Sequence, residues 1–458
     1  MLADSSPSPA LVPPQTDSPT LTSQSSLTSQ SSPTTQFEAF KDPRKATYLN
    51  PEGADRPLRN PVPDSTLRAA RAYRLSRIRE QLDRHDVAGI LLMDPVNIRY
   101  ALDSSNMQIW TMHNVSRYAL VLAGGPAVLF EYGSCLHLAD GLEGVDEVRV
   151  ATPFVYHTAG DQGPEKATIF AAEIADLMRT HGGGNLRLAI DKIEPLGLDA
   201  LRAQGLSIVE GQELTEQARA LKGADELDLM RWTIRVAEAA MARIYEASEP
   251  GVTERELWAL LHHENARSGG DWLETKLLTS GPRTNPWYQE CSDRVVNAGE
   301  LISFDTDMIG PFGYCADLSR SWVCGHTPMN GTQRTLYSAA RDQIEHNLAV
   351  LRPGLSFSEF NARSWRIPVD YAPYRYTVAV HGVGMADEWP FIPTHPDFDP
   401  RYRGQFEVGH VVCVESLIGA AETECVKLET QALITESGAQ RLDTFPWEDE
   451  PADLVRTG

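Results

Sequence analysis

Apolar and polar positions alternate in a regular pattern from Ser65 onward, and the first part of this pattern predicts a compact α/β domain over 65–222. Apolar residues at helical spacing indicate amphipathic helices, and short apolar runs between them indicate buried strands. Gly124-Gly125-Pro126 separates two of these runs, which is typical of a hairpin. The predicted elements are helices over 67–85 and 166–181 and strands over 89–93, 118–122, 127–132 and 186–190.

A second domain is predicted over 223–447, and it opens with two helices. Residues 226–247 carry apolar side chains at helical spacing. Thr253 and Glu256 precede the next apolar run in the capping-box arrangement, so we expect a helix to start there. Strands then dominate, with one helical interruption near 332–350.

The segments outside the two domains have a different composition. Residues 1–37 are mostly Ser, Thr, Pro and Gln, so they offer little apolar surface, and we predict a disordered tail there. The Pro-rich segment 38–64 is predicted to be extended, and 448–458 is predicted to be a C-terminal tail.

Composition and charge narrow the class of protein. The formal net charge of −22 argues against a nucleic-acid partner, because such partners require clustered Lys and Arg. No apolar run is long enough to span a membrane, and the N-terminus lacks a secretory signal pattern. The six cysteines show no Cys-x-x-Cys spacing, so we expect free thiols and a cytoplasmic protein.

Three carboxylates lie in an otherwise apolar stretch over 303–322, namely Asp305, Asp307 and Asp317. Burying isolated ionised carboxylates is costly, so a metal centre is the simplest partner for them. Residues 301–309 are predicted to form one strand, which would point Asp305 and Asp307 to the same face. A returning strand after Gly310-Pro311 would place Asp317 beside them. The alternative is that some of these acids occupy strand edges or turns.

Three downstream residues extend this candidate metal site. His381 precedes Gly382-Val383-Gly384, while Glu415 and Glu429 each lie in an apolar run. Taken singly, the histidine could be a core residue, and each glutamate could be a solvated acid at a strand end. Together with the aspartates they form an oxygen-rich set with one imidazole, which suits Mn, Fe, Co or Zn. Two divalent ions would neutralise most of the negative charge.

The order Asp, Asp, His, Glu, Glu and the segment Gly313-Tyr-x-x-Asp317-x-x-Arg320 resemble the creatinase/methionine aminopeptidase/prolidase superfamily, M24. The resemblance covers about residues 222–440 and more weakly 66–220. It implies an α+β fold: a pita-bread catalytic domain preceded by a smaller α/β creatinase-like domain. It also implies a homodimer that binds two divalent metal ions. The ligands carried over by the resemblance are Asp307, Asp317, His381, Glu415 and Glu429, with Asp305 as a further candidate.

Several departures from the peptidases of this superfamily are informative. Asp307 and Asp317 are ten residues apart where the peptidases have eleven, and Thr306 stands at the usual place. No histidine occurs between 264 and 325, where peptidases carry a substrate-site histidine. The second histidine of the peptidase motif His-Gly-x-Gly-x-x-x-His is replaced by Asp387, one residue closer to His381. Two histidines that assist peptide hydrolysis are therefore missing.

The segments Phe304-Asp-Thr-Asp307, 280–287 and 381–390 instead resemble the DddP-type dimethylsulfoniopropionate (DMSP) lyases. That resemblance implies elimination of dimethyl sulfide from a small zwitterion, with acrylate as the other product. It implies that Asp387 is the general base, and the alternative is that Asp387 orients a metal ligand. It also implies iron as the metal, although such ligands accept Mn, Zn, Co or Ni too.

Aromatic and basic residues near these motifs are candidates for substrate contacts. Aromatic faces suit a sulfonium cation. Tyr376 is a candidate catalytic residue because it lies five positions before His381. Arg283 could bind the substrate carboxylate, although a structural ion pair is the favoured interpretation. The other substrate-binding candidates are Trp287, Tyr288 and Trp389.

Two other functions are compatible with the fold. The first is an M24-type metallohydrolase, such as an X-Pro dipeptidase or a creatinase-like amide hydrolase. The missing histidines argue against it. The second is a non-catalytic pita-bread binding protein, and the complete ligand set argues against that.

Overall fold

The computed structural model describes residues 58–448. The predicted tail 1–37, most of segment 38–64 and all but the first residue of 448–458 lie outside the described residues. Over 58–63 the chain has no regular secondary structure, and the first described helix begins at Asp64.

The N-terminal part is built on a mixed six-stranded sheet with the order β4-β3-β2-β1-β5-β6. Its strands are β1 (Gly89–Leu92), β2 (Tyr118–Leu122), β3 (Ala127–Glu131), β4 (Glu147–Val150), β5 (Arg187–Ile190) and β6 (Ser207–Glu210). The predicted hairpin is confirmed, because β2 and β3 pair antiparallel across the Gly124-Gly125-Pro126 turn. The other pairs include parallel ones, such as β1 with β5, which need the helical crossovers that follow.

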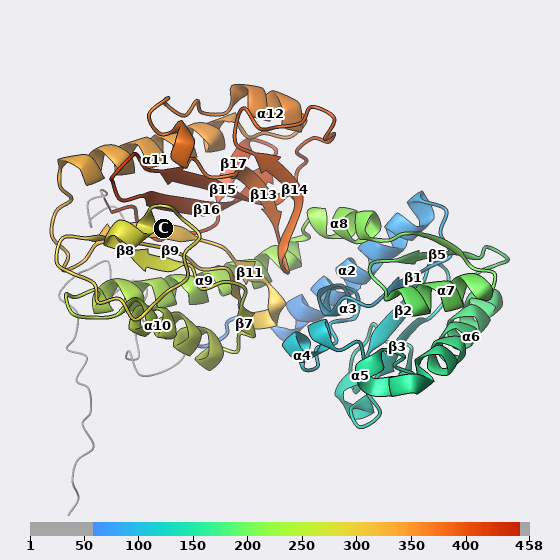
Figure 1. Ribbon diagram of the computed structural model, residues 1–458. Coiled ribbons are helices and arrows are strands. Elements are labelled where there is room, and N and C mark those ends of the chain that lie inside the picture. The colour runs from blue at the N-terminus through green and yellow to red at the C-terminus, as the bar shows by residue number, and fades with distance from the viewer. Residues whose placement is uncertain (1–57, 449–458) are drawn as a thin grey trace, which may run out of the picture. The chain divides into compact units, whose positions relative to one another are not determined.

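Helices surround this sheet (Figure 1). They are α2 (Asp64–Arg84), α3 (Pro95–Leu102), α4 (Gln108–His113), α5 (Tyr156–Ala159), α6 (Gly163–His181), α7 (Pro195–Ala203) and α8 (Gln212–Ala220). The helix predicted over 166–181 is α6, which buries one apolar face. Phe170 and Ile174 on that face are fully buried and pack with strand residues such as Leu120.

The C-terminal part starts with α9 (Ala224–Ala247) and α10 (Glu254–Arg267). The predicted capping box at the start of α10 is confirmed. The amide of Glu256 donates to Thr253 Oγ1 at 3.2 Å, and the amide of Thr253 donates to Glu256 Oε2 at 2.8 Å. Two more helices follow, α11 (Gly331–Val350) and α12 (Phe357–Arg363), so the helical interruption predicted near 332–350 is α11.

Three sheets carry the candidate site, with the orders β11-β10-β7, β12-β9-β8 and β14-β13-β15-β16-β17. Strands of the two small sheets are β7 (Trp272–Leu273), β8 (Leu278–Ser280), β9 (Leu301–Asp305), β10 (Met308–Ile309), β11 (Cys315–Ala316) and β12 (Ser319–Val323). Strands of the large sheet are β13 (Val378–Val383), β14 (Asp387–Pro393), β15 (Val411–Ile418), β16 (Val426–Thr435) and β17 (Gly438–Arg441).

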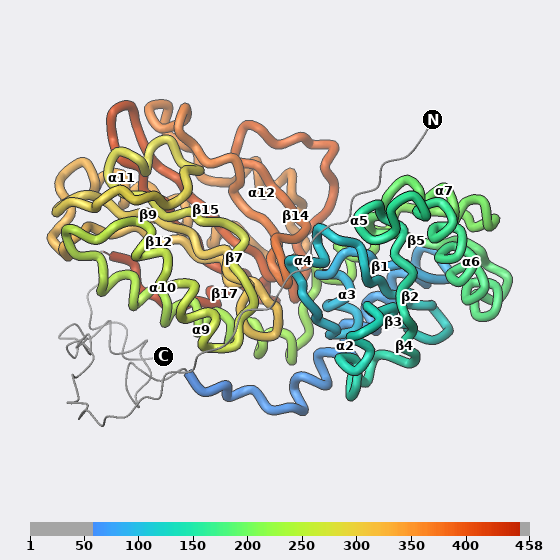
Figure 2. The backbone as a smooth tube through the Cα atoms, turned by 60° about the horizontal axis from the view of Figure 1, so that its bottom comes forward, coloured from blue at the N-terminus to red at the C-terminus, as the bar shows by residue number. Residues whose placement is uncertain are grey.

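The small sheet of β8, β9 and β12 lies against one face of the large sheet (Figure 2). Hydrogen bonds join the two sheets: Ser303 Oγ donates to the carbonyl of Cys425, and Ser321 Oγ donates to that of Lys427. Helix α11 packs on the large sheet through Leu336, Ala340 and Ile344. The site residues are therefore held between two packed layers of sheet.

The prediction of one continuous strand over 301–309 was wrong. Strand β9 ends at Asp305 and pairs with β12, whereas β10 begins at Met308 and pairs with β11 and β7. Asp307 lies in the break with a φ of +36°, which an extended strand does not allow. Thr306, which stands at the spacing used by peptidases, turns inward and accepts from the amide of Leu318 at 2.9 Å.

Candidate metal centre and its pocket

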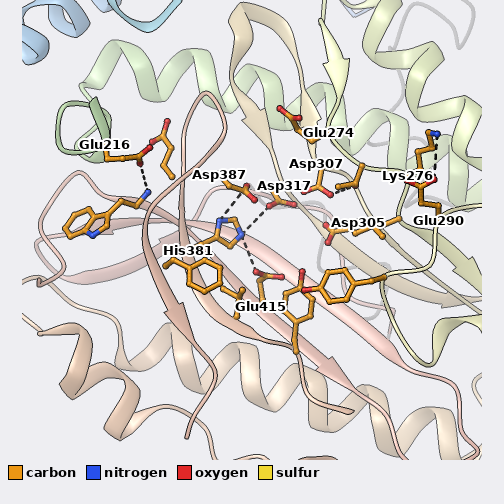
Figure 3. Close-up of a pocket in the computed structure, with 18 of the residues that line it drawn as sticks. Glu216, Glu274, Lys276, Glu290, Asp305, Asp307, Asp317, His381, Asp387 and Glu415 are labelled. Atoms are coloured by element: carbon orange, nitrogen blue, oxygen red, sulfur yellow. Dashed lines mark hydrogen bonds and ion pairs between the residues drawn. The ribbon is translucent and has the colours of Figure 1, made fainter. Parts of the chain in front are cut away.

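Five of the six sequence-predicted metal residues, all except Glu429, line one pocket of about 660 Å³. In Figure 3 the aspartates of the β9–β12 region face His381 and Glu415 of the large sheet across this pocket. Three groups of side chains each bring their ligand atoms within 4.8 Å of one another. These groups are Asp317, His381, Cys413 and Glu429; Asp305, Asp307 and Asp317; and Asp305, Glu415 and Glu429.

Strand register places the ligands of the large sheet together. Glu415 of β15 lies directly opposite Glu429 of β16, and His381 of β13 lies opposite Cys413 of β15. Because side chains two positions apart share a face, Cys413 and Glu415 point to the same side. His381 Nε2 is 3.4 Å from Asp317 Oδ2, 3.3 Å from Glu415 Oε1 and 3.4 Å from Glu429 Oε1.

Asp307 reaches the site because the chain turns between β9 and β10, and not because alternate residues of one strand share a face. The Asp307 carboxylate accepts a hydrogen bond from Thr275 Oγ1, and its carbonyl accepts from the amide of Glu274 at 2.9 Å. These two hydrogen bonds stabilise the left-handed backbone conformation of Asp307. Asp305 and Asp307 therefore both reach the pocket, as predicted, although the expected reason was incorrect.

Burial disfavours the ionised form of the three aspartates of this cluster, whereas Lys427 and His381 outweigh burial at Glu429 and lower its pKa. Burial raises the pKa of Asp305 to about 7, with Glu429 and Glu415 adding to the effect and Lys427 opposing it. Burial also raises the pKa values of Asp307 and Asp317 well above their ordinary values. Metal coordination would remove this penalty by neutralising the ionised forms.

Unpartnered buried oxygen atoms indicate where cations fit. Among the described residues, Asp305 Oδ1, Asp317 Oδ1 and Glu429 Oε1 are buried without any hydrogen-bond donor. Buried polar atoms are rarely left without partners, and carboxylate oxygens aimed into a polar pocket are metal ligands. The residues present therefore fit a divalent metal centre.

Lys427 belongs to this cluster, although the sequence did not indicate it. Its ammonium is fully buried and lies 2.8 Å from Glu415 Oε2, 2.9 Å from Glu429 Oε2 and 3.1 Å from Asp305 Oδ2. It also lies 4.7 Å from the centre of the Tyr376 ring. The sequence did contain one indication of this position. Residues 427 and 429 are two apart on a predicted strand, so their side chains should share a face.

Cys413 is the second residue that was missed. Its thiol lies 3.8 Å from Asp317 Oδ2 and beside His381, and burial raises its pKa well above the ordinary thiol value. A thiol held neutral in this way is a neighbour of the metal ligands rather than an obvious thiolate ligand. Its position two residues before Glu415 could have indicated that it faces the site.

Asp387, the predicted general base, lies at the edge of the metal cluster. Its Oδ1 atom is 3.7 Å from His381 Nδ1, and its side chain is 66% exposed to the pocket and solvent. Nδ1 also contacts the carbonyl of Gly382 at 2.9 Å. Asp387 is therefore placed beside the ligands but directed at the open part of the pocket (Figure 3).

Aromatic residues line part of the pocket. Tyr288 and Tyr376 stack with their ring centroids 5.5 Å apart, and both line the pocket. Trp389 also lines it, while packing edge-on against Phe357 at 5.2 Å. Three of the predicted substrate-facing side chains thus line the pocket, and two of them are in contact.

Arg283 and Trp287 are not among the described residues that line this pocket. Arg283 pairs with the fully buried Glu254 and donates to Ser292 Oγ at 2.8 Å. Trp287 is 7% exposed and packs with Leu417 in a small apolar cluster. Arg283 therefore forms the structural ion pair that the sequence analysis favoured, and neither residue is carried into the proposed substrate site.

We expect the stability of the metal-free protein to depend on pH through Asp305. Its pKa is about 7 when folded against an ordinary value of 3.8, so the folded state holds the proton longer. The stability from this group is full below about pH 4 and is lost as the pH rises through about 7. Thermal melts in chelator across this range should show a smaller decline for Asp305→Asn than for wild type. An unchanged decline would contradict the assignment.

Comparisons with known proteins agree with this geometry. Residues 228–436 match the model of metallopeptidase family M24. The chain is 41% identical to dimethylsulfoniopropionate lyase DddP of Roseovarius nubinhibens, over 84% of this chain and 88% of that protein. It is 40% identical to the protein of the same name from Roseobacter denitrificans, with the same coverage. The chain belongs to the DddP family.

Solved structures of more distant proteins show the fold. An Xaa-Pro dipeptidase from Bacillus anthracis is 19% identical, with a TM-score of 0.67 over 82% of this chain and 98% of its own. A prolidase from Pyrococcus horikoshii is 20% identical, with a TM-score of 0.66 over 82% and 99%. This DddP-family chain has the predicted pita-bread fold behind a smaller α/β domain. The predicted domain boundary at 222 stays a prediction.

Among the described residues of this DddP-family chain, no helix combines the length and apolar character needed to cross a bilayer.

Proposed function

We propose that this protein is a metal-dependent carbon–sulfur lyase that cleaves DMSP to dimethyl sulfide and acrylate. The observation that carries the proposal is Asp387. It presents a carboxylate to the pocket, 3.7 Å from His381, and stands one residue closer to His381 than the second histidine of the peptidase motif. The likeness to the two DddP lyases supports the same substrate.

The residues around the pocket can supply each requirement of a β-elimination. Asp387 would take a proton from the carbon next to the substrate carboxylate. The electrons of that C–H bond form the new C=C bond as the C–S bond breaks. The sulfonium sulfur leaves with the bonding pair as neutral dimethyl sulfide, and acrylate remains. The proton stays on Asp387 until solvent removes it.

The metal ligands would hold two divalent cations, which supply Lewis-acid stabilisation of charge on the substrate carboxylate. The proposed ligands are Asp305, Asp307, Asp317, His381, Glu415 and Glu429. Charge supports the number two, because the five carboxylates are then balanced by Lys427 and two divalent ions. We propose iron as the natural metal, with Mn, Zn, Co or Ni as substitutes.

The aromatic wall of the pocket would receive the sulfonium group. Tyr288, Tyr376 and Trp389 offer ring faces, which attract a weakly hydrated cation without a strong counter-charge. Burial and the nearby Glu415 raise the pKa of Tyr376, so its phenol stays protonated beside the substrate. The protonated phenol can donate a hydrogen bond to the substrate.

The family resemblance also supports a homodimer in the cytoplasm, and both remain predictions.

Purified, metal-replete protein incubated with DMSP should release dimethyl sulfide, measured in the headspace, together with an equal amount of acrylate. X-Pro dipeptides should remain uncleaved, because the histidines of the peptidases are absent. Chelator should abolish release, and added Fe²⁺ or Mn²⁺ should restore it. Peptide cleavage without dimethyl sulfide would instead support a hydrolase, and inactivity toward both would support a binding protein.

A further inference from the structure

A buried ionic network joins helix α8 to the strand that carries Asp387. Glu388, the next residue along β14, has a side chain that is 1% exposed. Its Oε2 atom lies 2.7 Å from Lys222 Nζ, and its Oε1 atom lies 3.4 Å from Arg219 Nε. Arg219 belongs to α8, and Lys222 lies two residues beyond the last residue of that helix, Ala220. Glu388 borders the same pocket as Asp387, but its carboxylate is directed to these two cationic side chains.

The same carboxylate holds the turn that leads from His381 to Asp387. Glu388 Oε1 accepts a hydrogen bond from the amide of Met385 at 2.9 Å. The carboxylate folds over Gly384, where an added Cβ would lie 2.3 Å from Glu388 Oε1. The carbonyl of Gly384 in turn accepts from the amide of Cys315 at 2.7 Å, so the turn is fixed from two sides.

A second contact from α8 fixes the strand one residue beyond Glu388. The Glu216 carboxylate accepts from the backbone amide of Trp389 at 2.8 Å (Figure 3). Glu216 also pairs with Arg219, and Arg219 donates to Asn97 Oδ1 at 2.9 Å. The backbone on the C-terminal side of Asp387 is thus tied to the N-terminal part at Glu388 and Trp389.

We propose that Glu388, Lys222, Arg219 and Glu216 form a positioning network that sets the location of the Asp387 carboxylate for proton abstraction. The inference rests on the proposed lyase function and extends it, because it makes α8 part of the catalytic apparatus. Glu388 and Glu216 line the pocket, but none of the four belongs to the groups of possible metal ligands. They restrict the 384–389 backbone, and misplacement of a general base by about 1 Å can lower turnover about 100-fold.

The test compares kcat, KM and metal content for Glu388→Gln. The glutamine keeps the shape and can still accept from Met385, but it removes the charge that Lys222 and Arg219 surround. We expect kcat for DMSP to fall by about 10-fold to 100-fold, with KM and metal content little changed. Lys222→Met should have a similar effect. The double variant should be no slower than either single variant, because the pair acts as a unit.

The chain offers a matched control in Glu131 of β3. Its side chain is 1% exposed, pairs with Arg117 at 2.9 Å and accepts a backbone amide, that of Tyr132, at 2.8 Å. It does not line the pocket. Glu131→Gln should lower the melting temperature about as much as Glu388→Gln while leaving kcat unchanged. Equal losses of kcat in the two variants would show that general destabilisation is responsible and would overturn the proposal.

Hydrogen exchange gives a readout that does not depend on turnover. In Glu388→Gln, amides of 384–389 should exchange faster, while those of β15 and β16 keep their protection. If wild type releases no dimethyl sulfide, the proposed function fails, and this exchange result still decides whether the network fixes the turn. If wild type is active and Glu388→Gln keeps its kcat, the positioning inference fails alone.

Discussion

Asp387→Asn is expected to abolish elimination while leaving both the fold and the metal content intact. Asparagine has nearly the same shape as aspartate but cannot accept the proton from carbon, so kcat should fall by about 10²–10⁴-fold. The side chain is largely exposed and makes no buried ion pair apart from its 3.7 Å approach to His381. Stability should therefore change little. Headspace dimethyl sulfide, metal analysis and thermal melting measure the three quantities.

Glu290→Gln is the matched control for this variant. Glu290 also lines the pocket, and its only described ion pair is with Lys276 at 3.7 Å. Both substitutions remove one negative charge from a pocket that receives a cationic substrate. We expect Glu290→Gln to change KM but not kcat. Of these two pocket residues, Asp387 is the one that lies beside the candidate ligand His381.

Two results would contradict the base assignment in different ways. Full activity in Asp387→Asn would mean that another group removes the proton. Loss of activity together with loss of metal would mean that Asp387 chiefly orients His381, as carboxylates beside metal-bound histidines often do.

The sequence could indicate the candidate metal residues, which the structure brings into one cluster, because each is conspicuous in its local context. Asp317, Glu415 and Glu429 are ionisable groups inside apolar runs, and such groups require a charge partner when buried. The start of α10 was predictable for a similarly local reason, since its capping box involves only Thr253 and Glu256. Local signals of this kind do not depend on the rest of the fold.

The break at Asp307 could not be predicted from local signals. Apolar residues surround it, so the pattern favours a continuous strand over 301–309. The left-handed backbone at this non-glycine residue is unfavourable by itself and is held by contacts to Thr275 and Glu274. Those contacts come from a loop about thirty residues earlier, which tertiary folding alone brings close.

Charge partners were the least predictable part of the site. Lys222 pairs with Glu388, which is 166 residues away in the sequence, and Arg283 pairs with Glu254, which is 29 residues away. Lys427 is adjacent to recognised ligands, but a lysine in a strand is usually solvent-facing, and only its complete burial identifies it as part of the cluster. A single sequence, considered without an alignment of related sequences, does not indicate which distant residues form ion pairs.

The second large effect is expected for Asp317, which the proposed two-metal centre should share between its ions. Asp317 belongs both to the group around His381 and to the group formed with Asp305 and Asp307. Asp307 belongs only to the latter. A residue common to both groups contributes to both sites, so its loss should be more damaging than the loss of a residue that serves one.

Metal analysis of Asp317→Asn and Asp307→Asn can test this difference directly. We expect about two ions per chain in wild type, about one in Asp307→Asn and almost none in Asp317→Asn, with elimination lost in both variants. Both substitutions conserve shape and remove one buried carboxylate whose pKa is raised by burial, so each variant is a control for the other. Equal metal loss in the two variants would argue against a shared ligand at Asp317. A wild-type content of about one ion would contradict the binuclear centre and leave the charges of five carboxylates only partly balanced by Lys427 and metal.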